Sequence, residues 1–201
     1  TQAESSAASD VYKRQVTRDP QFVWATLVLH NMTDVVSFFR PGKHYSPDLK
    51  EAFGEERTII VRPTYMMGPG DRTDRFTYWP IRLAKGGETL VPGKADDPVQ
   101  YIDARDVAKF MIDLIEAKNA ATYNAVGPAK ATGMKAFIEE AQEAFEVESS
   151  LIMIPDYDFL LEHKVPYVVP WIMPTGENYG SARVNNQHAI ANGLQFRPLV
   201  E

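Results

Sequence analysis

The stretch of sequence that decides the fold runs from residue 57 to residue 127 and reads RTIIVRPTYMMGPGDRTDRFTYWPIRLAKGGETLVPGKADDPVQYIDARDVAKFMIDLIEAKNAATYNAVG. Its run TIIV, at residues 58–61, is β-branched and uninterrupted, which is typical of a strand covered on both faces. Further short strands are predicted at residues 89–91, 99–102 and 122–126. Because helical segments separate these strands, the stretch predicts an α/β fold.

The helices between these strands carry start and stop signals. Asp103 is a good N-cap for the helix that follows, and Asp106 adds negative charge where a helix N-terminus favours it. Apolar residues then recur at helical spacing on one face of this helix, namely Val107, Phe110, Met111, Leu114 and Ile115. An earlier helix is predicted over residues 76–85, with Gly86 and Gly87 as its stop.

The sequence that follows this stretch is easier to interpret than the sequence that precedes it. Residues 22–29, FVWATLVL, form a short apolar run that is either a buried strand or part of a helix, and periodicity does not decide between them. Downstream, Thr132 can cap a helix with one apolar face. A strand is then predicted at 151–154, followed by short helices at 157–163 and 185–192.

The composition of the 201-residue chain excludes several classes of function. Twenty-one basic against 27 acidic residues give a net charge of −6, which argues against a general binder of nucleic acid or of anionic membranes. The sequence contains no cysteine, so disulfides and thiolate chemistry are excluded, and its four scattered histidines predict no zinc site. No apolar run approaches the roughly 20 residues that span a bilayer. The composition predicts a soluble, cytoplasmic protein without a metal.

The first residues of the chain differ in character from the rest. Residues 5–15 read SSAASDVYKRQ, which is the in-frame translation of a common transposase sequencing adapter. A natural polar tail is the alternative, but a match over eleven consecutive codons favours the adapter. We therefore interpret residues 1–15 as a disordered artefact outside the fold, and we expect the true start of the gene to be missing. Residues 16–50 have no clear assignment.

Three long motifs of the sequence indicate a resemblance to a known protein family. They are GPGD-x-TDRF-x-YW from Gly68, DPVQ-x-ID-x-RD from Asp97, and VPWIMPTGENYGSARVNNQHAIANGLQFRPL from Val169. With these motifs, residues 51–201 resemble the carboxy-terminal half of an extended short-chain dehydrogenase/reductase. More narrowly, they resemble the bacterial NAD-dependent epimerase/dehydratase group. The resemblance does not extend to residues 16–50.

The resemblance implies the carboxy-terminal part of a Rossmann-like, NAD(P)-binding fold with a small α/β substrate-binding lobe. The amino-terminal half of the Rossmann sheet is expected to be missing, because a dinucleotide site needs a Gly-rich turn and the chain has no G-x-G-x-x-G. Gly68-x-Gly70 is a weak substitute, since Asp71 follows it and would repel a phosphate. NAD or NADP is thus expected in the full-length parent, but not as a tightly bound cofactor of this chain.

The resemblance also implies catalysis by a tyrosine and by a lysine four residues later on one helix face, where the lysine ammonium lowers the tyrosine pKa. Tyr45 and Lys50 are the candidates that the chain offers. They are five residues apart, with Pro47 between them, and five residues turn a regular helix by about 140° beyond one full turn. The pair is therefore either the catalytic dyad, a loop, or a damaged or spliced remnant.

Other positions match the family in its cofactor and substrate contacts. Pro63, Thr64 and Tyr65 resemble the loop that lies along the nicotinamide ring, with a plain exit from the strand as the alternative. The substrate-binding candidates are the charged and polar residues of the lobe and its cleft: Asp71, Arg72, Asp74, Arg75, Tyr78, Gln100 and Arg105.

Simpler interpretations stay open for these substrate-binding candidates. The charged residues after Gly70 could form a surface ion-pair cluster, and Arg105 could be a solvated residue in the first turn of a helix. Tyr78 with Trp79, and Trp171, are aromatic residues of the kind that more often pack than bind sugars. Val99 stands where nucleotide-sugar epimerases have an arginine that binds diphosphate, which argues against a nucleotide-sugar substrate.

Together these features predict the substrate-binding portion of an NAD(P)-dependent epimerase/dehydratase-type oxidoreductase, inactive as this chain alone. Its parent would transfer hydride at a hydroxyl or carbonyl carbon of a small polar or sugar-like substrate. One alternative is a non-catalytic binding or sensor module of the same fold. Another is a fragment without independent function, whose unpaired strand edges invite self-association or a homo-oligomer.

Overall fold

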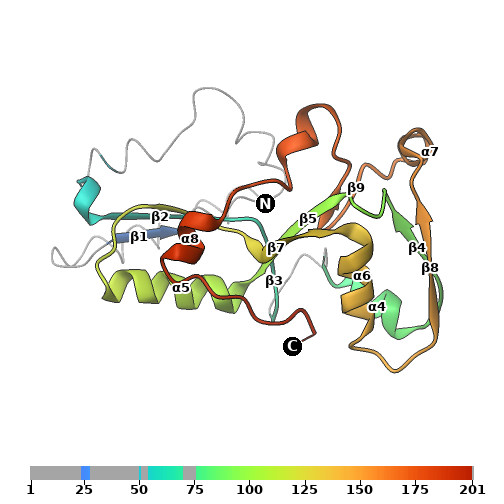
Figure 1. Cartoon of the computed structure of the whole chain (residues 1–201), viewed down its shortest axis with the longest axis horizontal. Coiled ribbons are helices and arrows are strands. Elements are labelled where there is room, and N and C mark those ends of the chain that lie inside the picture. Colours follow the sequence, from blue (N-terminus) through green and yellow to red (C-terminus); the bar gives the residue numbers. More distant parts are fainter. Residues whose placement is uncertain (1–23, 28–49, 51–53, 70–75, 201) are drawn as a thin grey trace, which may run out of the picture. The chain divides into compact units, whose positions relative to one another are not determined.

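The computed structural model describes residues 24–27, 50, 54–69 and 76–200 (Figure 1). The chain divides into two compact units. The first comprises residues 1–61 and 113–122, and the second comprises residues 62–112 and 123–201.

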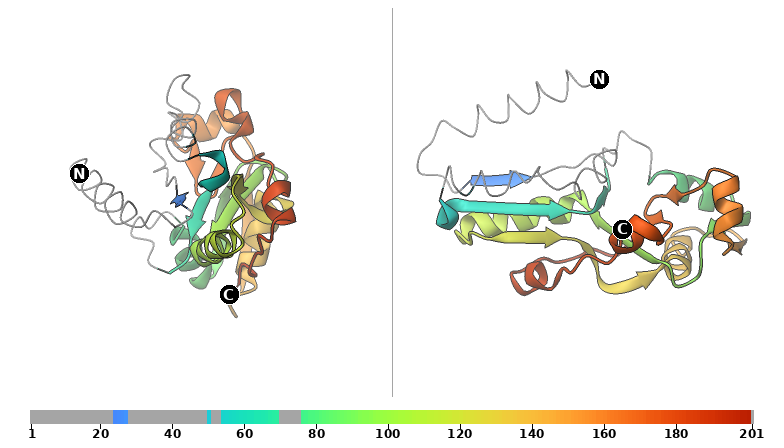
Figure 2. Two further views of the ribbon diagram at one scale, coloured as in Figure 1. Left: turned by 90° about the vertical axis from the view of Figure 1, so that its left-hand side faces the viewer. Right: turned by 90° about the horizontal axis from the view of Figure 1, so that it is seen from above.

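The first unit is built on a parallel strand pair. It contains the 3-10 helix η2 (Glu55–Arg57), the strand β1 (Trp24–Leu27) and the first four residues of β2 (Thr58–Pro63), and these four pair in parallel with β1 (Figure 2). The ambiguous run at residues 22–29 thus contains a strand. Residues 58–61 are buried, which confirms the strand predicted from the run TIIV. The amide of Ile60 donates to the carbonyl of Ala121 at 2.9 Å, next to β6 (Thr122–Ala125), and the sheet order is β1–β2–β6.

The second unit contains a mixed sheet, a parallel strand pair and a small hairpin. The mixed sheet has the order β3–β5–β7, with β3 (Tyr65–Met67) parallel and β7 (Gly127–Gly133) antiparallel to β5 (Pro98–Asp103). The strand pair is β4 (Gly87–Pro92) with β8 (Ser149–Ile154), and the hairpin is β9 (Tyr167–Val168) with β10 (Trp171–Ile172). Parallel pairing recurs in both units, so the predicted α/β class is confirmed.

The helices of the structure agree with the apolar spacing of the sequence. They are α4 (Tyr78–Ala84), α5 (Ala104–Glu116), α6 (Met134–Gln142), α7 (Tyr157–Glu162), the 3-10 helix η3 (Gly176–Gly180) and α8 (Gln187–Ala191). On α5, Val107, Phe110 and Leu114 are buried, and Met111 and Ile115 are half-buried. The amphipathic helix after Asp103 is therefore confirmed.

The core of the second unit lies where α4 and α6 pack together beside the strands (Figure 1). Phe76 and Phe137 meet edge to face across this contact, with ring centroids 6.1 Å apart. Trp79 is fully buried, and its indole N–H donates to the carbonyl of Val169 at 2.7 Å. Trp171 is also fully buried. Both tryptophans are core residues, as their simpler interpretation predicts.

Strand β7 corrects one expectation. Thr132 was a candidate helix cap, but it lies within β7, opposite Val99 of β5. Helix α6 starts only at Met134, and the residue before it, Gly133, has no side chain to cap it. The prediction of a cap at Thr132 is wrong because pairing with β5 holds residues 127–133 in an extended conformation.

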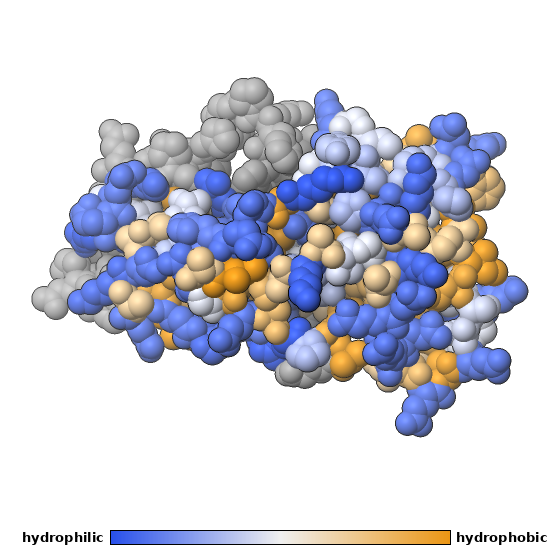
Figure 3. Space-filling model, viewed as in Figure 1, coloured by the Kyte–Doolittle hydropathy of each residue, from blue (hydrophilic) through white to orange (hydrophobic). Residues whose placement is uncertain are grey.

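The outer surface of the β4–β8 pair carries an apolar patch. Leu90 is 59% exposed and Ile152 is 37% exposed, and the two are register partners on adjacent strands. Figure 3 shows hydrophobic surface on the side of the molecule where these strands lie. Self-association through exposed strands stays a prediction. Within the described residues, no helix combines the length and apolar character needed to cross a membrane.

Candidate functional site

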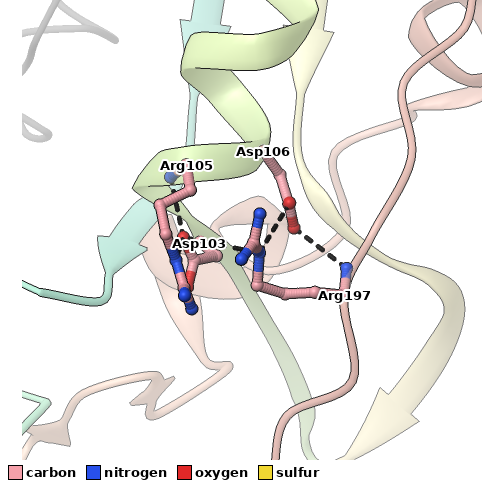
Figure 4. Close-up of polar contacts among 4 residues, drawn as sticks. All are labelled: Asp103, Arg105, Asp106 and Arg197. Carbon is pink, nitrogen blue, oxygen red and sulfur yellow. Dashed lines mark hydrogen bonds and ion pairs between the residues drawn. The ribbon is translucent and has the colours of Figure 1, made fainter. Parts of the chain in front are cut away.

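The junction between β5 and α5 carries a bidentate ion pair. Asp103 is the last residue of β5, and its Oδ1 accepts a hydrogen bond from the backbone amide of Arg105 at 2.7 Å, so it caps α5 as predicted. The Arg105 guanidinium then folds back on the same carboxylate, with Nε 2.9 Å from Oδ1 and Nη2 2.7 Å from Oδ2 (Figure 4). One buried carboxylate therefore caps the helix and holds the arginine.

One turn further along, Asp106 binds the end of the chain. Its Oδ1 accepts from Nε of Arg197 at 2.7 Å, and its Oδ2 accepts from the backbone amide of the same arginine at 3.0 Å (Figure 4). The same Arg197 Nε lies 3.7 Å from Oδ1 of Asp103. We call Asp103, Arg105, Asp106 and Arg197 the charged cluster. It ties the carboxy-terminal segment to the start of α5.

The two arginines set the protonation state of Asp103. Burial by itself raises the pKa of this carboxyl group. Hydrogen bonds from the side chain and amide of Arg105, together with the charges of Arg105 and Arg197, outweigh burial and lower the pKa below its ordinary value. Asp103 is therefore a carboxylate at neutral pH.

This lowered pKa predicts acid sensitivity. In the unfolded chain the Asp103 pKa returns to about 3.9. Its contribution to the free energy of unfolding is thus complete above about pH 5 and is lost as the pH falls through the lower, folded-state pKa. We expect Asp103→Asn to be less stable than the parent chain at neutral pH, with the difference shrinking in acid. Urea unfolding across this pH range measures the difference, and a gap that does not depend on pH would contradict the assignment.

A cavity of about 370 Å³ lies beside the charged cluster. This volume falls in the range of about 300–1,000 Å³ typical of small-molecule sites. Its apolar lining includes Met67, Phe76, Pro80, Phe196 and Leu199. All four residues of the charged cluster line it as well, together with Tyr101 and Glu140. The cavity therefore combines an apolar body with a polar edge, the usual composition of a ligand pocket.

The predicted catalytic pair is described only in part. Tyr45 lies outside the described residues. Nζ of Lys50 lies 3.2 Å from Oε1 of Glu55 in an exposed ion pair, and the carbonyl of Lys50 accepts from the amide of Gly54. The Lys50 ammonium thus has a carboxylate neighbour, and the pairing of Tyr45 with Lys50 stays a prediction.

The predicted nicotinamide loop lies beside one of the substrate-binding candidates. Pro63, Thr64 and Tyr65 lead from β2 into β3 and are half-buried. The Thr64 hydroxyl is 3.5 Å from the carbonyl of Gln100. The Gln100 side chain faces a different partner: its Nε2 donates to the carbonyl of Val184 at 2.9 Å, and its Oε1 accepts from the Val184 amide at 3.0 Å. The Gln100 side chain therefore holds the chain segment that precedes α8.

Of the remaining substrate-binding candidates, the structure describes Tyr78 and Arg105, which lie on different helices. Asp71, Arg72, Asp74 and Arg75 lie outside the described residues. Tyr78, at the start of α4, is 46% exposed and meets Trp79 edge to face, with centroids 5.0 Å apart. Arg105 belongs to the charged cluster, paired with Asp103, so it is not simply a solvated helix residue.

Sequence reasoning did not assign the cluster's other members to a site. Asp103 and Asp106 lie in the motif that begins at Asp97, and the sequence predicts for them only an effect on the helix N-terminus. Arg197 belongs to the motif that begins at Val169, but no local pattern predicts its pairing with Asp106, which lies 91 residues away. In the described part of the chain, no group of three or more His, Asp or Glu side chains is arranged to hold a metal ion.

Neither a protein-family model nor a curated protein sequence matches this chain. Solved structures do resemble it. A human epimerase family protein in complex with NADPH is 18% identical, with a TM-score of 0.52 over 96% of this chain and 68% of that one. The dTDP-4-dehydrorhamnose reductase of Bacillus anthracis in complex with NADP is 18% identical, with a TM-score of 0.48 over 74% and 48% of the two chains. The UDP-glucose 4-epimerase of Thermus thermophilus in complex with NAD is 15% identical, with a TM-score of 0.48 over 78% and 46%.

The reductase and the Thermus epimerase are matched over only about half of their own length. At these identities the similarity is evidence for the fold alone. That evidence comes from the human epimerase family protein, which has the highest TM-score of the three. The chain therefore has an α/β fold similar to that of this epimerase family protein, and the resemblance carried by the sequence motifs is confirmed at the level of the fold.

Proposed function

We propose that this chain is the substrate-binding portion of an NAD(P)-dependent oxidoreductase of the epimerase/dehydratase type. The parent would act at a hydroxyl or carbonyl carbon of a small polar or sugar-like molecule. The observation that carries the proposal is the fold shared with the human epimerase family protein bound to NADPH, over 96% of this chain. The motifs around Gly68 and Asp97 support the same group.

The described residues do not fit the pyrophosphate of a dinucleotide. Such a site needs glycines that open a cradle of backbone amides at a helix N-terminus. Gly68, at the end of β3, instead faces a carboxylate: a Cβ placed there would lie 3.0 Å from Oδ2 of Asp103. Negative charge at this point would repel a phosphate. We therefore assign no cofactor phosphate to the described residues.

The strongest support for a substrate-facing role comes from the loop at Pro63–Tyr65. It continues directly from the buried strand β2, and Thr64 contacts the backbone of Gln100 on the neighbouring strand. The side chain of Gln100 is occupied by Val184, and that of Arg105 by Asp103. We propose that these two residues position the walls of the substrate site, while the exposed ring of Tyr78 is available to a ligand.

A titration of the purified chain with NADPH and NADH tests this proposal. We expect no binding up to millimolar cofactor by isothermal titration calorimetry, because the pyrophosphate turn is absent from the sequence. A cooperative thermal transition of the same sample shows that the chain is folded.

Micromolar binding would contradict this assignment. The variants Tyr45→Phe and Lys50→Met would then distinguish a complete enzyme from a sensor module. Loss of turnover in these variants would indicate a complete enzyme with this dyad, whereas unchanged binding and no turnover would indicate a sensor module.

A further inference from the structure

A buried tyrosine side chain lines the cavity beside the charged cluster and is not part of that cluster. Tyr101, on β5, is 8% exposed, and its ring packs on Phe137 with centroids 5.1 Å apart. Within the part of the chain that the structure describes, its hydroxyl makes no hydrogen bond. Burial, and then the negative charge of Glu140, raise the pKa of Tyr101 well above its usual value, so the phenol stays protonated. Tyr101 therefore brings to the cavity lining a buried, neutral donor that has no partner among the described residues.

The charges of the described residues that line the cavity disfavour an anionic ligand. Arg105 is paired with Asp103, and Arg197 with Asp106, so the charged cluster is neutral as a whole. Glu140 adds one negative charge to the lining. An anionic ligand would meet this charge and would have to compete with two existing carboxylates for the guanidinium groups.

We propose that this cavity is a binding site for a neutral small molecule with an apolar body and one hydroxyl or carbonyl group. The oxygen of that group accepts a hydrogen bond from the Tyr101 hydroxyl. The body packs against Met67, Phe76 and Leu199, and a volume of about 370 Å³ accommodates one or two rings. Where the ligand group is a hydroxyl, its proton faces Glu140. The site does not depend on the proposed oxidoreductase function.

Fluorine NMR of the purified chain with 4-fluorophenol tests the proposal. We expect broadening of the probe signal and a dissociation constant that rises about 3–10-fold in Tyr101→Phe, which removes a single hydrogen bond donor. Tyr179→Phe is the matched control, because Tyr179 is 62% exposed and does not line the cavity, and it should bind as the parent chain does. 4-Fluorotoluene lacks the hydroxyl and should bind more weakly, with no loss in Tyr101→Phe.

Two further comparisons make the result decisive. 4-Fluorobenzoate should bind more weakly than 4-fluorophenol, because it is anionic at neutral pH. Leu199→Trp, near the end of the chain, should fill the cavity and abolish binding while a cooperative thermal transition persists. The proposal is overturned if millimolar 4-fluorophenol does not bind, if folded Tyr101→Phe binds it as tightly as the parent, or if Leu199→Trp leaves binding unchanged.

Discussion

Replacement of Asp97 by alanine is expected to lower the free energy of unfolding by about 3–5 kcal/mol. Asp97 is 5% exposed and accepts three hydrogen bonds. Its Oδ2 binds the indole N–H of Trp171 at 2.8 Å and the amide of Lys94 at 2.9 Å, and its Oδ1 binds the hydroxyl of Tyr157 at 2.5 Å. Alanine leaves all three donors without an acceptor. Urea unfolding followed by tryptophan fluorescence measures the loss.

Asp97→Asn distinguishes hydrogen bonding from charge at this position. Its carbonyl oxygen can replace Oδ2 for Trp171 and Lys94, and its amide can donate to the oxygen of Tyr157. Burial by itself raises the pKa of Tyr157, so in this variant the phenol stays protonated and its oxygen can still accept. We expect a loss of only about 1 kcal/mol.

The exposed neighbour Asp96 provides the matched control. Asp96→Ala should stay within about 0.5 kcal/mol of the parent chain. Equal losses in Asp97→Asn and Asp97→Ala would show that the charge of Asp97, and not its geometry as an acceptor, stabilises the second unit.

Asp106→Ala is expected to cost about 2–3 kcal/mol and to loosen the end of the chain. The substitution removes two acceptors of Arg197, one for its guanidinium and one for its backbone amide. The expected cost lies below that of a fully buried pair, because the Arg197 side chain is 23% exposed and partly screened by solvent. Hydrogen exchange at the Arg197 amide should accelerate along with the loss of stability.

Glu116→Ala is the control for this second prediction, since Glu116 is an exposed residue of the same helix. It should change stability by no more than about 0.5 kcal/mol. If Asp106→Ala left the exchange rate at Arg197 unchanged, the tie between α5 and the carboxy-terminal segment would be wrong.

Local patterns predicted most of the second unit. The apolar spacing of α5 and the cap at Asp103 each depend on neighbours a few residues apart, so both are visible in the sequence. Strand β7 is different. Residues 127–133, GPAKATG, are mostly small and contain no run of β-branched or aromatic residues, and they form a strand because the edge of β5 offers hydrogen bonds to them.

The candidate site was less predictable than the fold. The contact of Gln100 with Val184 spans 84 residues, and that of Asp97 with Trp171 spans 74. Spacing along the chain carries no information about such pairs. The sequence equally gave no sign that the Tyr101 hydroxyl has no hydrogen-bond partner among the described residues, because a tyrosine in an apolar strand has the pattern of an ordinary core residue.

The sequence by itself determined the α/β class, the strand at residues 58–61, the amphipathic face of α5 and the family of folds, since each follows from side-chain size and polarity over a few residues or from long contiguous motifs. Only the tertiary structure decided that the run at 22–29 contains a strand, that Thr132 lies in a strand, and that Asp106 holds Arg197 beside a cavity. Those outcomes depend on which distant backbone or side-chain groups meet. The free energy that stabilises these contacts comes from pairing and burial between distant segments, so no local sequence pattern predicts them.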